Sequence, residues 1–76
     1  MIYIELVSDM MDLGIITKVQ ACTLIARHRQ RLRVVKHVSD SNEEYRETET
    51  FMREIYRQAS LEEKDEIEGM RLPELV

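Results

Sequence analysis

Three side chains of this 76-residue chain could serve as a nucleophile or as imidazole ligands: Cys22, His28 and His37. All three fall in one stretch with helical periodicity, where successive residues turn by about 100° around the axis. They therefore point in three directions and cannot close a tetrahedral metal site, and Cys22 and His28 cannot pair as thiolate and imidazole. The carboxylates occur in runs typical of a solvated face, and no glycine-rich phosphate loop appears. We expect no enzymatic activity, no metal and no cofactor.

The basic segment, residues 27–37, reads RHRQRLRVVKH and holds five Lys or Arg side chains and two His. The chain as a whole has a formal net charge of −4. Residues 1–38 carry six basic and three acidic side chains, net +3, whereas residues 39–76 carry five basic and twelve acidic ones, net −7. Such a segment can bind phosphates, pair with acidic residues of the same chain or dock a partner protein.

Two helices are expected in the half that contains the basic segment. Apolar spacing predicts a helix over about residues 3–13, ended by Gly14, although alternation at the start also allows a short strand over residues 1–7. Thr17 and Gln20 have the spacing of a capping box and predict a helix that runs from about Lys18 to His37.

The same capping signal recurs twice in the acidic half. Ser41 with Glu44 predicts a helix to about Ala59. Ser60 with Glu63 predicts a shorter helix over residues 61–68, which Gly69 and Pro73 end.

Composition limits the fold class. The chain has two Gly and one Pro, which argues against disorder and against a hairpin-rich β fold. Its apolar residues are mainly aliphatic, with five Met and no Trp. The sequence therefore predicts an all-α domain over residues 1–69, followed by a tail over residues 70–76. The domain would be built on two long antiparallel amphipathic helices with a short helix at each end.

Around the helix of residues 18–37, an apolar stripe with His28 at its middle divides the basic side chains. Arg27 and Arg31 lie on one side of this stripe. The other side carries Lys18, Arg29, Arg33 and Lys36. The next helix carries an acidic side, Glu43, Glu44, Glu47 and Glu54, which could pair with one of these arginine sets. We expect about half of the basic segment to be neutralised within the fold, and His28 to be a core histidine with one hydrogen-bond partner.

The remaining basic residues favour a non-enzymatic protein-interaction or regulatory factor that binds a larger protein or a second copy of itself. The expected polar contact edge is Arg29, Arg33 and Lys36. Leu72 and Leu75, in an unusually apolar tail, are the expected apolar anchors, unless the tail folds back over the core.

The alternative is a nucleic-acid-binding module, because the helices over 3–13 and 18–37 resemble a helix-turn-helix in outline. Its contacts would be Lys18, Arg27, Arg29, Arg31 and Arg33. The negative net charge opposes this reading, and there is no aromatic platform for single strands. The acidic second half could instead imitate nucleic acid.

The expected location is a reducing cytoplasm. One cysteine excludes an intramolecular disulfide, and we find neither a signal peptide nor a stretch long enough to span a membrane. Small chains without catalytic motifs are typical of accessory proteins of bacteria and their phages.

Overall fold

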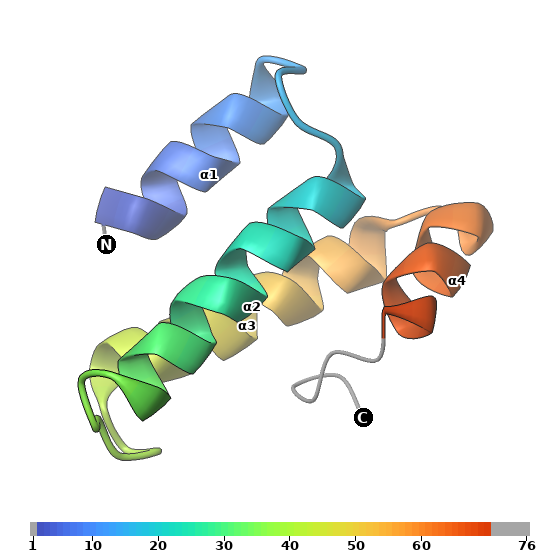
Figure 1. The fold of residues 1–76 in the computed structure, drawn as a ribbon. Helices are drawn as coiled ribbons and strands as arrows, with labels where there is room; N and C mark the ends of the chain where they lie inside the picture. Colours follow the sequence, from blue (N-terminus) through green and yellow to red (C-terminus); the bar gives the residue numbers. More distant parts are fainter. Residues whose placement is uncertain (1, 71–76) are drawn as a thin grey trace.

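The computed structural model describes residues 2–70, and every regular element in that range is a helix (Figure 1). The helices are α1 (Ile2–Asp12), α2 (Lys18–Val34), α3 (Glu43–Gln58) and α4 (Leu61–Gly69). The prediction of an all-α chain is confirmed for this range, and the alternative of a strand over residues 1–7 is wrong for the part described. The tail residues 71–76, with Leu72 and Leu75, lie outside the described residues.

The turn between α1 and α2 confirms Gly14 as a helix stop. Gly14 has a φ of 76°, a conformation that glycine adopts without a Cβ penalty. Its N–H donates to the carbonyl of Met11 at 3.1 Å, and the N–H of Ile15 donates to the carbonyl of Met10 at 2.9 Å. This pair of hydrogen bonds is a Schellman motif, which satisfies carbonyls that the end of α1 would leave free.

Two of the three expected capping boxes are formed. The Thr17 hydroxyl accepts from the Gln20 N–H at 3.1 Å, and the Gln20 side chain accepts from the Thr17 N–H at 2.9 Å. Ser60 and Glu63 make the same reciprocal pair at the start of α4. The hydrogen bond from the Ser60 N–H to the Glu63 carboxylate lowers the pKa of Glu63.

The third capping box is not formed, since α3 begins one residue later than expected. Asn42 caps it by accepting from the Tyr45 N–H at 3.1 Å, while the Ser41 hydroxyl pairs with the Ser39 hydroxyl at 2.9 Å. Asn is as good an N-cap as Ser, so Ser41 and the adjacent Asn42 were both able to start the helix.

The end of α2 also differs from the prediction. The helix ends at Val34 rather than at His37, because His37 takes a left-handed φ of 54°. The N–H of Val38 then closes the turn on the carbonyl of Leu32 at 3.1 Å. Val34 and Val35 are β-branched and favour helix weakly, which helps to explain the early stop.

α2 is the central helix and contacts each of the other three, most extensively α3. Figure 1 shows α2 and α3 side by side, joined at one end by the loop of residues 35–42. All four helices contribute to one aliphatic core, whose buried members are Val7, Ala21, Cys22, Ile25, Ala26, Met52, Ile55, Ala59 and Ile67. None of the helices within residues 2–70 is long and apolar enough to cross a membrane.

Candidate functional site

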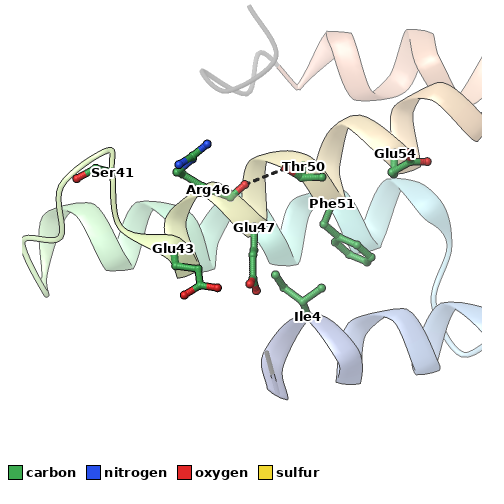
Figure 2. A pocket seen from close by; sticks show the side chains of 8 residues that line it. All are labelled: Ile4, Ser41, Glu43, Arg46, Glu47, Thr50, Phe51 and Glu54. Carbon is green, nitrogen blue, oxygen red and sulfur yellow. Dashed lines mark hydrogen bonds between the residues drawn. The ribbon is translucent and has the colours of Figure 1, made fainter.

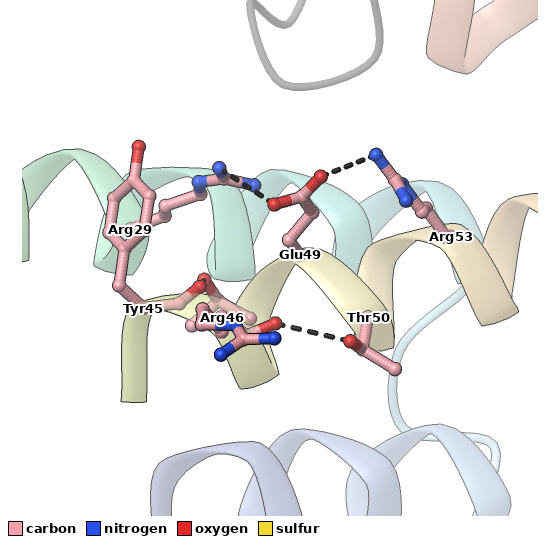
Figure 3. Close-up of polar contacts among 7 residues, drawn as sticks. Arg29, Tyr45, Arg46, Glu49, Thr50 and Arg53 are labelled. Atoms are coloured by element: carbon pink, nitrogen blue, oxygen red, sulfur yellow. Dashed lines mark hydrogen bonds and ion pairs between the residues drawn. The ribbon is translucent and has the colours of Figure 1, made fainter. Parts of the chain in front are cut away.

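Arg29 is buried inside the fold, which corrects its assignment to an exposed contact edge. Only 7% of the residue is accessible. Its guanidinium carbon lies 4.2 Å from the centroid of the Tyr45 ring, and its Nη2 lies 3.4 Å from a carboxylate oxygen of Glu49 (Figure 3). Glu49 also accepts from Arg53 on the next turn of α3. Arg29 therefore joins α2 to α3 and is not available to a ligand.

The burial of Arg29 has an electrostatic cost. Its Nε and Nη1 atoms are buried and have no hydrogen-bond partner among the described residues. Unsatisfied buried donors cost free energy, although contact of the guanidinium and its methylene stem with Tyr45 compensates in part. A helical wheel places Arg29 at the border of the apolar stripe, where sequence alone does not decide whether an arginine turns inward.

His28 lies at the junction of three helices. Its ring stacks on Tyr3 of α1, with centroids 4.3 Å apart and an interplanar angle of 22°. Its Nε2 lies 3.5 Å from a carboxylate oxygen of Glu44 on α3, and no hydrogen bond to this buried nitrogen is formed. The expected position in the core is partly confirmed, because His28 is half-buried. The expected hydrogen bond is not made at Nε2.

We expect His28→Leu to keep or raise the free energy of unfolding. Leucine retains apolar contact with α1 and removes a buried nitrogen that lacks a hydrogen bond. Urea denaturation followed by circular dichroism measures this change. A clear loss of stability in His28→Leu would mean that stacking on Tyr3 and attraction to Glu44 outweigh the desolvation of the ring.

The exposed side of α2 carries a small basic and apolar surface. The residues Arg27, Gln30, Arg31, Val34 and Val35 line a shallow hollow of about 250 Å³, and we call them the α2 patch. Val34 and Val35 are 60% and 63% exposed. Neither arginine forms a side-chain hydrogen bond or ion pair within residues 2–70. The α2 patch therefore combines two unpaired arginines, which could bind a ligand, with two solvent-exposed valines.

The other predicted contact residues do not gather into one site. Arg33 and Lys36 are exposed, and their side chains also make no ion pair with a described residue, but Arg33 lies about 100° or more around α2 from the centre of the α2 patch. Lys18 lies at the opposite end, about 20 Å from Arg31 along the helix. Its charge helps to lower the pKa of Glu63 on α4, so it is already associated with an acidic residue.

Sequence reasoning missed a groove between α1 and α3. Its volume is about 740 Å³, and Figure 2 shows Ile4 of α1 and Glu47 of α3 converging in it. We call it the α1–α3 groove; its lining residues are Ile4, Ser41, Glu43, Arg46, Glu47, Thr50, Phe51 and Glu54. The four-residue spacing of Glu43, Glu47 and Phe51 was the available signal. That spacing does not show where α1 packs, so it could not predict the groove.

Cys22 is buried and unsuited to catalysis. None of its surface is accessible, and burial raises the pKa of its thiol to about 11. No three His, Cys, Asp or Glu side chains in residues 2–70 lie close enough together to hold a metal ion.

We predict that Cys22 reacts with an aromatic disulfide reagent at pH 8 only as fast as the protein opens. At a pH far below its pKa, a buried thiol is almost entirely protonated and offers almost no thiolate to the reagent. The labelling rate should rise by orders of magnitude in denaturing urea. Labelling of the native protein at the rate of a free thiol would contradict the packing of α2.

Comparison with known proteins assigns no family and no function to the chain. No protein-family model, no curated protein and no solved structure matches the chain.

Proposed function

We propose that this protein is a small, non-enzymatic interaction factor that binds another protein chain through the α2 patch. The observation that carries the proposal is the combination of two arginines without internal partners and two exposed valines on one side of α2. Charged groups beside apolar area favour protein association, in which the apolar contact supplies affinity and the charges select the partner.

In this proposal α2 and α3 form an antiparallel helical hairpin, with α1 and α4 as short helices at its ends. The buried Arg29 and the apolar core hold α2 rigid, so little conformational entropy is lost when the patch binds. The fitting partner is an acidic amphipathic helix, whose carboxylates would face Arg27 and Arg31. It belongs to a larger protein or to a second copy of this chain.

Arg33 and Lys36 could enlarge this contact on the neighbouring side of α2, since both are exposed. The apolar anchors Leu72 and Leu75 remain a prediction from sequence, because they lie outside the described residues. Arg29 is buried and takes no part in the proposed contact.

A second candidate function is nucleic-acid binding, which the exposed and unpaired Arg27, Arg31, Arg33 and Lys36 favour. Two observations weigh against it. α2 is packed against three helices, whereas the recognition helix of a helix-turn-helix must project into the major groove. None of the four aromatic rings is exposed for stacking on a base.

A titration with four probes tests the proposal. Backbone amide resonances would be followed by NMR while an acidic amphipathic peptide, a basic peptide of equal apolar content, duplex DNA or single-stranded DNA is added. We expect the acidic peptide alone to shift the amides of residues 27–35 and to saturate. Arg27→Gln/Arg31→Gln should weaken this binding by about tenfold, as expected for loss of two charge contacts at a small interface.

The control is Arg53→Gln/Arg57→Gln, which removes the same charge from two exposed arginines that are already paired with Glu49 and Glu54. It should bind the acidic peptide like the wild type. Tighter binding of either DNA at the same amides, with affinity falling by orders of magnitude between roughly 50 and 200 mM salt, would favour the second candidate. Absence of any shift at residues 27–35 would contradict both.

A further inference from the structure

The α1–α3 groove is chemically complementary to the α2 patch. Ile4 and Phe51 give the groove two apolar side chains, both half-buried. Glu43 and Glu47 add two carboxylates that have neither an ion pair nor a side-chain hydrogen bond within the described chain. The other charged residues of the lining are Arg46 and Glu54, and Glu54 is paired with Arg57. Two unpaired carboxylates beside two apolar side chains fit an apolar segment with basic side chains.

We propose that the α2 patch of one copy docks in the α1–α3 groove of a second copy. This inference rests on the proposed function, since it names the partner of the α2 patch. The chain itself supplies both halves of the contact, so no other partner chemistry has to be assumed.

The two surfaces match in spacing as well as in charge. Along α3, Glu43, Glu47 and Phe51 follow one another at intervals of four residues. Along α2, Arg27, Arg31 and Val35 follow at the same intervals. Residues four apart lie on one side of a helix, about 6 Å apart. Two helices placed in parallel would thus set each arginine opposite a carboxylate and Val35 opposite Phe51.

Val34 extends the same contact towards α1. It neighbours Val35 on the exposed side of α2, and Ile4 lies across the groove from Phe51. Burying these four apolar side chains would supply most of the affinity, because each exposed ion pair contributes only about 0–1 kcal/mol.

The placement of the two surfaces determines the type of assembly. α3 packs against α2 through Tyr45, Thr48, Met52 and Ile55, and the groove residues lie on the opposite side of α3. The α2 patch likewise lies opposite the buried side of α2. The patch and the groove therefore face away from each other. A docked pair leaves one free patch and one free groove, so association is head-to-tail and continues beyond the dimer.

Light scattering after size exclusion, from micromolar to millimolar protein, tests this association. The weight-average mass of the wild type should rise from 9.1 kDa to more than twice that value as concentration increases. The groove variant Glu43→Gln/Glu47→Gln and the patch variant Arg27→Gln/Arg31→Gln should each associate about tenfold more weakly, since each loses two charge contacts. Their circular dichroism should match the wild type, because all four side chains are at the surface or lack internal partners.

Mixing the two variants gives the decisive result. The intact patch of the groove variant can enter the intact groove of the patch variant, and the pair has no further functional surface. We expect a 1:1 dimer at concentrations where each variant alone is a monomer, and nothing larger. Glu62→Gln/Glu66→Gln on α4 is the matched control for loss of two exposed carboxylates, and it should associate like the wild type.

Three outcomes would overturn the head-to-tail contact: a wild type that stays at 9.1 kDa at millimolar concentration, association that neither variant weakens, or a mixture that forms no dimer. Binding of the acidic peptide to the α2 patch in a strictly monomeric wild type would refute self-association alone. It would leave the proposed function intact, with another acidic protein as the partner.

Discussion

Replacing Arg29 by alanine should lower the free energy of unfolding by about 2–3 kcal/mol, the lower end of the range for truncating a large buried side chain. The loss follows from the contact of the guanidinium and its stem with Tyr45, and from the ion pair with Glu49. Arg33→Ala is the control. Its side chain is exposed and unpaired among the described residues, so it should change stability by less than about 0.5 kcal/mol.

Arg29→Met separates packing from charge. Methionine retains most of the volume, and it removes the buried Nε and Nη1 donors that lack partners. Replacement of a buried charge by an apolar side chain of similar size is often neutral or stabilising. We therefore expect Arg29→Met to leave the free energy of unfolding unchanged or to raise it by up to about 2 kcal/mol. Urea denaturation of the three variants measures this. Equal destabilisation by Met and Ala would show that the charge, and not the packing, is what Arg29 contributes.

Ile67→Ala should cost about 3 kcal/mol, because Ile67 is fully buried and is the only residue of α4 that the core encloses. Leu61, at the start of the same helix, is 81% exposed. Leu61→Ala should therefore cost less than about 0.5 kcal/mol.

The size of the Ile67 effect matters because small domains are marginally stable. A chain of 76 residues has a stability of roughly 4–11 kcal/mol, so loss of one α4 anchor removes a large fraction of it. Hydrogen exchange of the α4 amides would report whether α4 detaches before the rest unfolds. Similar losses for Ile67→Ala and Leu61→Ala in urea denaturation would contradict the orientation of α4.

The helices were predictable where a local signal was strong and without competition. Thr17 with Gln20, Ser60 with Glu63, and Gly14 each fixed a helix end through hydrogen bonds between residues a few positions apart. The start of α3 was wrong by one residue, because Ser41 and Asn42 are both good caps. The end of α2 was wrong because His37 turns the backbone into the left-handed region, for which a histidine is a weak signal.

The candidate surfaces were less predictable, since they depend on how helices pack. Arg27 and Arg31 were correctly placed on one side of the α2 stripe. Arg29 was placed on the other side as an exposed residue, because a wheel cannot show that Tyr45 and Glu49 on α3 would enclose it. The α1–α3 groove could not be foreseen at all. The groove forms because the helix packing brings Ile4 of α1 opposite Phe51 of α3, and these residues are far apart in the sequence.

We propose that the basic segment is divided: Arg29 stabilises the fold, whereas Arg27 and Arg31 bind a partner. The most direct measurement compares the affinity of Arg29→Met and of Arg27→Gln/Arg31→Gln for the acidic amphipathic peptide, with wild type as reference. We predict wild-type affinity for Arg29→Met and a loss of about tenfold for the double variant. Equal loss of affinity in both variants, with both still folded, would contradict it, because Arg29 would then belong to the binding surface.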